Sequence, residues 1–467
     1  MNLTIVIPSY NSAPGLHCGL EHLAHQRLPA EHALQVIVVN DGSSDDTAEV
    51  VERFAARVPG LTCVFRPRDA LSCRSRARNL GVSRATGEVL TFLDAGVLVG
   101  PDFSARVLER YASGRGPVLV HLVHGLLAPA GTEPPTGLSP THFDAALARV
   151  ASLPEWFDLR TPLFEQVEDD LDRLPGAWAL GWTAALSVPR ALFDRVGGFD
   201  EDFLRWGDED CDFVHRLWQQ GASLRAERQA VALHLPHPLL DDAPPEPEPP
   251  SEPERFTASR KLLHRKRHGF ESELFIHCWN SIVFPRLLRR LEQLVLVYEL
   301  PPYAPTFNQW VASRYVGSGA SLLLGTDHPW LTRQFPVTHV AVHNQVTLRK
   351  LREAFPDRTL LHTLCLDTPF EDGAFDTAIV TDFLRLLGPS LQQAMLGELS
   401  RIARNVLFMC VEEYSPFTAA LGFGFSRVDE VRAAAARAGL RLQPEPGQQS
   451  GGPTLFRLLP SPERTHA

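Results

Sequence analysis

Short apolar runs alternate with helix-like stretches near the start of the chain, and this alternation constrains the fold more than any other feature. The runs cover residues 3–7, 34–39, 63–65 and 89–93, and helices are expected over residues 14–27, 45–57 and 72–84. Strands that are apolar throughout and separated by helices are typical of a parallel sheet covered on both faces. Such a sheet binds ligands beyond the carboxyl ends of its strands. Tyr10, Asp41 and Asp94 all follow strand ends of this kind.

A second alternation begins after residue 312. Its apolar runs cover residues 321–325, 339–343, 359–362, 375–381 and 405–411, with helices expected over 345–355 and 390–403. Residues 241–254 contain six prolines and six acidic residues, which favours an extended linker or exposed loop. We therefore expect an α/β chain with a first domain over residues 1–240, a linker and helical segment over 241–312, and a second, Rossmann-like domain over 313–467.

The composition excludes several classes of protein. A net charge of −10 gives no support to a nucleic-acid-binding role. Seven scattered cysteines without a Cys-x-x-Cys pair favour a reducing compartment, so we expect a cytoplasmic location. No run of 18 apolar residues predicts a transmembrane helix. The apolar and basic residues 284–298 allow at most a peripheral membrane contact, and a core helix would show the same pattern.

An acidic cluster opens the helix expected to end at Gly221. The cluster consists of Asp208, Glu209, Asp210 and Asp212 and follows the glycine pair 197–198. Because a helix N-terminus stabilises negative charge, we expect these carboxylates to be ionised near neutral pH. An ionised, positioned carboxylate can act as a general base towards an alcohol. The alternative is that these acidic residues only stabilise the N-terminus of the helix and take no part in catalysis.

Several short motifs occur in a fixed order within the first domain. They are Ile-Pro-Ser-Tyr-Asn at 7–11, Val-Asn-Asp-Gly-Ser-Ser-Asp-Asp-Thr at 39–47, Ala-Arg-Asn-Leu-Gly at 77–81, Ala-Thr-Gly-Glu at 85–88 and Phe-Leu-Asp-Ala-Gly at 92–96. Together they resemble the family 2 glycosyltransferases of the GT-A fold. Residues 197–218 resemble the galactosyltransferase-type motif, in which Gly-Gly-Phe-Asp-Glu precedes Trp-Gly-x-Glu-Asp. The resemblance covers residues 1–240 and implies a nucleotide-sugar donor and a glycan, lipid or natural-product acceptor.

The resemblance also implies a donor site. Its expected residues are Pro8, Tyr10, Asp41, Arg74, Arg78 and Asp94. Asp41 would accept the imide N–H of a uracil or thymine ring, and Tyr10 would stack on that ring. Arg74 and Arg78 would donate hydrogen bonds to the base or the diphosphate. Each of these residues also has a purely structural interpretation. Asp41 could form an Asx turn, Tyr10 could pack in the core, and the arginines could lie on a solvated helix face.

A divalent metal is expected at Asp94, which matches the first acid of the family's DxD motif. That acid would hold the donor's ribose and a Mn²⁺ or Mg²⁺ ion. The motif here is Asp-Ala-Gly, so its second acid is missing. We expect His234 to supply a ligand in its place, with His237 as the second candidate. A structural role for a histidine is the alternative.

Asp210 matches the catalytic base of the resembling enzymes. It would remove the acceptor's proton during a direct displacement, which inverts the anomeric centre of a donor such as a UDP-sugar. Glu209 would bind a hydroxyl of the acceptor or donor. Trp206 and Gly207 would form a platform for a sugar ring, with core packing as the alternative for Trp206.

The second domain has a weaker resemblance. Residues 367–380 resemble the middle motifs of class I S-adenosylmethionine-dependent methyltransferases, and the resemblance extends over residues 313–460. Asp367 would contact adenine, or would be a turn residue. Residues 324–329 contain only one glycine, and the second strand ends on His343 instead of an acid. We therefore expect a degenerate domain without S-adenosylmethionine. A bifunctional glycosyltransferase and methyltransferase, and a non-catalytic sugar-nucleotide-binding protein, are the other hypotheses.

Overall fold

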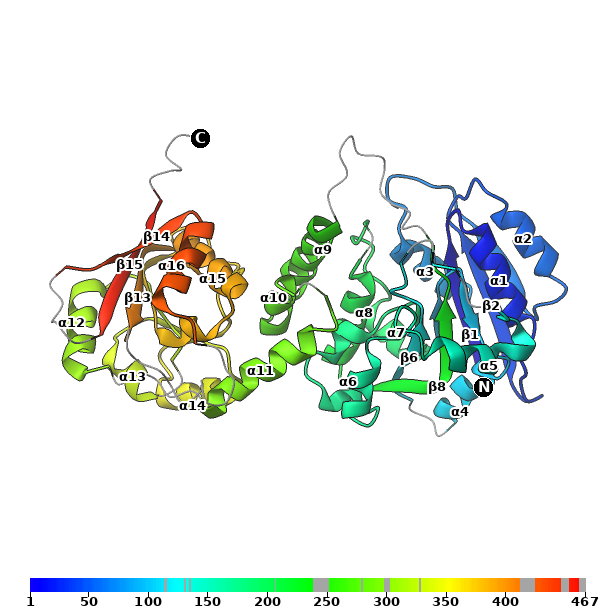
Figure 1. Cartoon of the computed structure of the whole chain (residues 1–467), viewed down its shortest axis with the longest axis horizontal. Helices are drawn as coiled ribbons and strands as arrows, with labels where there is room; N and C mark the ends of the chain where they lie inside the picture. Colours follow the sequence, from blue (N-terminus) through cyan, green and yellow to red (C-terminus); the bar gives the residue numbers. More distant parts are fainter. Residues whose placement is uncertain are drawn as a thin grey trace. The chain divides into compact units, whose positions relative to one another are not determined.

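The chain divides into two compact units (Figure 1). The first comprises Met1–Leu262 and Asn280–Pro285, and the second comprises Leu263–Trp279 and Arg286–Ala467. The computed structural model describes residues 1–112, 116–129, 132–133, 136–205, 207–237, 252–278, 280–297, 303–326, 329–411, 425–446 and 453–461. The boundary between the units therefore falls inside the segment that the sequence set apart as residues 241–312.

Within the described residues, the first unit contains an eight-stranded sheet. Its order is β3 (Leu61–Phe65), β2 (Ala33–Asn40), β1 (Asn2–Ser9), β4 (Val89–Leu93), β7 (Ala185–Pro189), β6 (Val118–His124), β8 (Leu224–His234), β5 (Val97–Val99). The first four strands are parallel, as the apolar runs predicted. β7 is antiparallel to both β4 and β6, and β5 is antiparallel to β8. The half of the sheet beyond β4, for which the apolar runs of residues 3–93 made no prediction, is mixed, because β6 and β8 pair in parallel.

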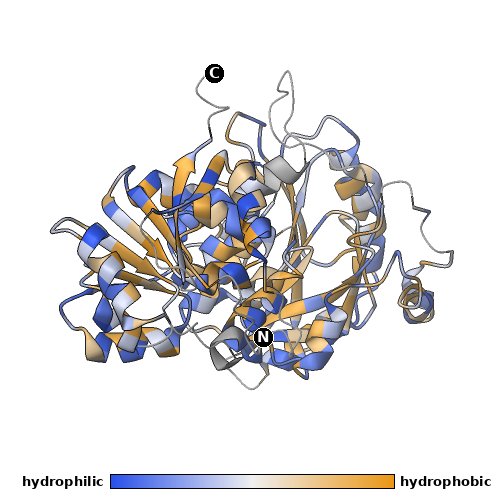
Figure 2. Cartoon of the chain, turned by 60° about the vertical axis from the view of Figure 1, so that its left-hand side comes forward, coloured by the Kyte–Doolittle hydropathy of each residue, from blue (hydrophilic) through white to orange (hydrophobic). Residues whose placement is uncertain are grey.

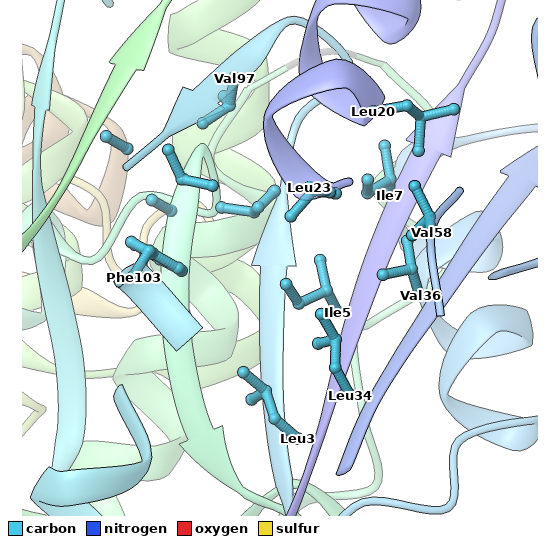
Figure 3. Packing of buried hydrophobic residues seen from close by; sticks show 14 of the residues in the cluster. Leu3, Ile5, Ile7, Leu20, Leu23, Leu34, Val36, Val58, Val97 and Phe103 are labelled. Carbon is cyan, nitrogen blue, oxygen red and sulfur yellow. The ribbon is translucent and has the colours of Figure 1, made fainter. Parts of the chain in front are cut away.

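Helices cover both faces of this sheet. They are α1 (Ala13–Leu23), α2 (Thr47–Phe54), α3 (Arg74–Ser83), α4 (Phe103–Tyr111), α5 (Phe143–Val150), α6 (Thr161–Gln166), α7 (Arg190–Val196) and α8 (Glu209–Gln219). Ile5 and Ile7 of β1 pack with Leu20 and Leu23 of α1 on one face (Figure 3). On the other face, α3 approaches β1 so closely that a Cβ at Gly81 would lie 2.4 Å from Val6.

An aromatic cluster anchors α8 behind the end of β4. The ring of Phe213 on α8 stacks on Phe199 with their centroids 4.2 Å apart, and both rings lie against Phe92 of β4 and Phe193 of α7. Truncating one such buried ring to alanine typically costs about 3–5 kcal/mol. This packing holds the N-terminus of α8, which carries the acidic cluster, in place.

The described part of the second unit contains a seven-stranded sheet. Its order is β11 (Thr359–His362), β10 (His339–Val342), β9 (Ser321–Leu324), β12 (Phe375–Val380), β13 (Ala403–Cys410), β15 (Thr454–Pro460), β14 (Leu440–Pro444). The first five strands are parallel, and β15 is antiparallel to both of its neighbours. Figure 2 shows the strands of both sheets mostly orange, whereas the surrounding helices also carry blue residues.

The helices after the proline-rich segment are α9 (Glu252–Arg267), α10 (Phe270–Ile276), α11 (Phe284–Val297), α12 (Pro305–Tyr315), α13 (Pro329–Gln334), α14 (Gln345–Ala354), α15 (Pro389–Ile402) and α16 (Val428–Arg437). Among the described residues, no helix has the length and apolar character needed to cross a membrane. In α11, the basic helix considered for membrane contact, Phe284, Leu288 and Leu291 are buried in the protein. The described part of its apolar stripe is therefore covered by protein packing.

Candidate functional site

A pocket lies at the carboxyl ends of β1, β2 and β4 in the first unit. It is lined by Pro8, Ser9, Tyr10, Ser12, Asp41, Arg68, Arg74, Ala77, Asp94, Ala95 and His237. The fold thus brings together five of the six residues expected to form a donor site. Arg78 is not among the lining residues, and the expected platform residue Trp206 lies outside the described residues.

Two arginines form ion pairs with Asp41, the residue expected to recognise the nucleotide base. Nη1 of Arg66 lies 2.6 Å from Oδ1 of Asp41, and Nη1 of Arg68 lies 3.0 Å from Oδ2. A carboxylate offers about four lone-pair positions, so Asp41 retains capacity to accept a further N–H. Sequence reasoning missed both arginines, although they directly follow the strand run at 63–65 and therefore belong to the same edge of the sheet.

Arg68 also covers Tyr10. Its guanidinium carbon lies 3.7 Å from the centre of the Tyr10 ring, which is a cation–π contact. Gly42 permits this arrangement, because it adopts a φ of +73° and a Cβ there would lie 2.7 Å from the backbone nitrogen of Arg68. The end of the pocket at Asp41 is therefore a compact group of one carboxylate, two cations and one aromatic ring.

The N-terminus of α3 forms another wall of the pocket. Arg74 is the first residue of this helix, and both Arg74 and Ala77 line the pocket. The free N–H groups and the dipole of a helix N-terminus attract anions such as phosphate. A cationic side chain at the same place adds to this attraction.

Arg78 lies beneath the pocket and connects two acids. Its side chain is only 1% exposed, with Nη2 3.1 Å from Asp94 and Nη1 2.9 Å from Glu209. Burial alone would lower the pKa of Arg78, but Asp94 and Glu209 outweigh it and raise the pKa. Burial would likewise raise the pKa of Asp94, but the charge of Arg78, with smaller effects of His234 and Arg74, lowers it. The buried guanidinium thus links Asp94 in the strand-end pocket to the first turn of α8.

Asp210 lies at the start of α8 and is partly exposed. Its Oδ1 accepts the N–H of Cys211 at 2.8 Å, and its Oδ2 accepts the N–H of Thr183 at 3.3 Å. Burial, followed by repulsion from Glu209, raises the pKa of Asp210 to about 7. Burial also raises the pKa of Asp208 to about 6. The expectation of full ionisation near neutral pH is therefore wrong for Asp210, because burial and like charges outweigh the helix N-terminus.

The turn before α8 has an unusual backbone. Gly207 has a φ of +112° and Asp208 a φ of +60°. The N–H of Gly207 donates to Oε2 of Glu209 at 3.3 Å, and its carbonyl accepts from Oγ of Ser259 at 2.7 Å. Nε of Arg260 lies 3.5 Å from Oδ2 of Asp208. Sequence reasoning missed Ser259 and Arg260, because no motif marks them within the helical segment.

His234 lies beside Asp94, where a metal ligand was expected. It ends β8 and pairs with Val97, three residues after Asp94. Its Nδ1 is buried and has no hydrogen-bond partner among the described residues, and its ring centroid lies 5.2 Å from that of His237. Burial lowers the pKa of His234 to about 4, so the imidazole is neutral at pH 7. No group of three or more His, Cys, Asp or Glu in the described part of the chain is arranged around a possible ion.

In the second unit, side chains fill the strand ends where a cofactor was considered. The ring of Phe383 stacks on His343 with their centroids 4.5 Å apart. Gly325 follows β9 with a φ of +81°, and a Cβ there would lie 2.6 Å from Cβ of Phe383. Oγ1 of Thr381 donates to the carbonyl of Gly325 at 2.7 Å.

The loop after β11 is held by two side chains from the preceding helices. The carbonyl of Asp367 accepts from Nε2 of His264 at 2.7 Å. The buried carboxylate of Glu273 accepts the N–H groups of Leu366 at 2.6 Å and Leu364 at 3.1 Å. Burial raises the pKa of Glu273 to about 7 despite these hydrogen bonds.

Sequence comparison with known proteins relates the first unit to glycosyltransferases. The sequence matches glycosyl transferase family 2 over residues 4–135 and the family described as the N-terminal domain of galactosyltransferase over residues 175–237. A validoxylamine A glucosyltransferase of Streptomyces hygroscopicus subsp. jinggangensis (strain 5008) is 32% identical over 437 residues, with 87% of this chain and 96% of that protein covered. A second validoxylamine A glucosyltransferase, from Streptomyces hygroscopicus subsp. limoneus, is also 32% identical over 437 residues, with 87% of this chain and 89% of that protein covered.

Among solved structures, S. aureus TarS 1-349 in complex with UDP aligns with a TM-score of 0.39 at 16% identity, over 67% of this chain and 79% of that one. The strand-end pocket of the first unit, the acidic turn of α8 and the two sequence matches define an enzyme of the glycosyltransferase class. The identity to the two glucosyltransferases extends over most of the chain and shows its family. The chain belongs to glycosyl transferase family 2. This confirms the family and the activity that the motifs of residues 7–96 predicted.

Proposed function

We propose that the chain is an inverting glycosyltransferase that moves glucose from UDP-glucose to a hydroxyl of a natural-product acceptor. The observation that carries the proposal is the position of Asp210, a partly exposed carboxylate that Arg78 and Glu209 connect to the donor pocket at Asp94. The choice of glucose and of such an acceptor follows the names of the two relatives, which match this chain across both units.

In this mechanism, Asp210 removes the proton of the acceptor hydroxyl. The acceptor oxygen forms a bond to the anomeric carbon while the bond from that carbon to the diphosphate oxygen breaks. UDP leaves with the bonding electron pair, and Asp210 keeps the proton. A single displacement of this kind inverts the anomeric centre, so an α-linked donor yields a β-glycoside. A base with a pKa near the working pH is suited to this task.

The donor would lie along the pocket. Asp41, held by Arg66 and Arg68, would accept the imide N–H of uracil, and Tyr10 and Pro8 would contact the ring. Arg74 and the N-terminus of α3 would bind the diphosphate. Asp94 would hold the ribose, and Glu209 a sugar hydroxyl. The acceptor would approach from the turn of Trp206 and Gly207.

A divalent metal fits the residues present. The orphaned, buried Nδ1 of His234 beside Asp94 offers a nitrogen ligand next to a carboxylate, a combination that suits Mn²⁺ better than Mg²⁺. His237 lines the same pocket and is a further ligand candidate. When bound, the ion would neutralise charge on the departing diphosphate.

We propose further that the second unit is a class I methyltransferase-like domain that does not bind S-adenosylmethionine. A sheet of five parallel strands extended by an antiparallel β15 supports the resemblance. The contacts of Phe383 with His343 and Gly325 support the loss of the cofactor, because they fill the strand ends that the cofactor would need.

The test combines donor binding and turnover by the full chain. UDP and dTDP are titrated calorimetrically with Mn²⁺ and then with EDTA, and transfer from UDP-glucose to validoxylamine A is assayed for the wild type and Asp210→Asn. We expect UDP to bind both proteins equally, and Asp210→Asn to lose about 10²- to 10⁴-fold in kcat, which is the range that a general base contributes. Wild-type turnover by Asp210→Asn would remove Asp210 from the base role. Failure of both nucleotides to bind the wild type would favour a non-catalytic protein.

A further inference from the structure

The turn that carries the acidic cluster is held by residues that lie beyond the two segments, 4–135 and 175–237, that match glycosyltransferase families. Residues 259 and 260 lie on α9, beyond the proline-rich segment, yet both contact residues 207–208. The side chains of Arg260 and Asp208 are each only 4% exposed, so their ion pair is almost fully buried. Buried ion pairs are strongly coupled, because removal of one partner leaves the other charge without compensation.

The contacts fix two consecutive residues with uncommon backbones. Oγ of Ser259 donates to the carbonyl of Gly207, and Arg260 pairs with the carboxylate of Asp208. Asp208 is a non-glycine residue with positive φ, a conformation that persists only when its surroundings impose it. Asp208 is also the residue that precedes α8, so its conformation sets the direction in which the helix begins at Glu209 and Asp210.

We propose that Ser259 and Arg260 are positioning residues for sugar transfer: they hold the turn of residues 207–208 so that Asp210 faces the acceptor hydroxyl. The inference rests on the proposed role of Asp210 as the base. The structure supports it because neither residue lines the donor pocket, while both contact the turn directly before Asp210. Their loss should therefore affect the chemical step and leave donor binding unchanged.

The test uses the full chain with UDP-glucose and validoxylamine A. Arg260→Met should lower kcat about 10- to 100-fold, because small misplacements of reacting groups cost up to about 10²-fold. The Kd of UDP should stay at its wild-type value, and the KM of the acceptor should change much less than kcat. Arg260→Lys, which keeps a positive charge, should recover part of the loss. Lys261→Met is the matched control: it removes a neighbouring, exposed positive charge from the same helix and should behave as wild type.

Ser259→Ala removes one hydroxyl and keeps the ion pair, so it tests the proposal even if Arg260→Met fails to fold. We expect a smaller loss of kcat with unchanged UDP affinity. Wild-type kcat in both Ser259→Ala and Arg260→Met would overturn the proposal. The proposal would also be overturned if Arg260→Met lost kcat, UDP affinity and Tm together and Arg260→Lys restored none of them. That pattern indicates a purely structural contact.

Asp210→Asn separates this inference from the proposed function. If Asp210→Asn is inactive and the Arg260 variants have wild-type kcat, only the positioning role fails. If Asp210→Asn turns over normally, the base assignment fails, and the positioning role fails with it.

Discussion

At the scale of single residues, the raised pKa of Asp210 makes a prediction about pH. A general base works only when it is unprotonated, and burial with Glu209 and Asp208 nearby raises the pKa of Asp210 to about 7. The kcat/KM of the full chain, which reports the pKa values of the free enzyme, should therefore fall as the pH drops through 7, by about tenfold per unit at the acid end. A kcat/KM profile between about pH 5 and pH 9 checks this. A flat profile down to about pH 5 would contradict the prediction, because it would require a base with an ordinary carboxylate pKa.

Local sequence predicted five of the residues that line the strand-end pocket of the first unit but not how they are held. Tyr10, Asp41 and Asp94 could be placed because each follows an apolar run, and parallel strands bring their carboxyl ends to one edge. The ion pairs of Asp41 with Arg66 and of Arg78 with Glu209 join residues far apart in the sequence, so no local pattern marks them. The pKa of Asp210 was predicted wrongly for the same reason, since burial and neighbouring charges are consequences of tertiary packing.

At the scale of elements, α10 stabilises the second unit through Glu273. The carboxylate of Glu273 accepts two backbone N–H groups and the hydroxyl of Thr363 in the loop after β11. Glu273→Ala would leave these buried donors without partners, and each unsatisfied donor costs about 1–3 kcal/mol. We expect the free energy of unfolding to fall by about 3 kcal/mol or more in denaturant titration. Glu273→Gln keeps one acceptor oxygen and should cost less.

Glu292→Ala is the control for this prediction, because Glu292 is an exposed residue of the neighbouring α11. Equal stability of Glu273→Ala and Glu292→Ala would contradict the role of Glu273. Sequence analysis recognised the strands on either side of this loop by their apolar runs. It could not assign Glu273, because an acidic residue in a short helix is usually exposed and only the packing of α10 shows that this one is buried.

At the scale of the whole molecule, the two units should differ in their response to ligands. A ligand at about 100 times its Kd stabilises the folded state by about 2.7 kcal/mol, so a functioning site shows as a higher Tm. UDP should stabilise the full chain, because the donor site proposed for it in the first unit is an open pocket. S-adenosylmethionine should leave the Tm unchanged, because Phe383 and His343 fill the strand ends of the second unit. The measurement is thermal unfolding of the full chain with each ligand alone. Stabilisation by S-adenosylmethionine would contradict the prediction and favour a bifunctional enzyme, since the stacked pair would then have to separate to admit the cofactor.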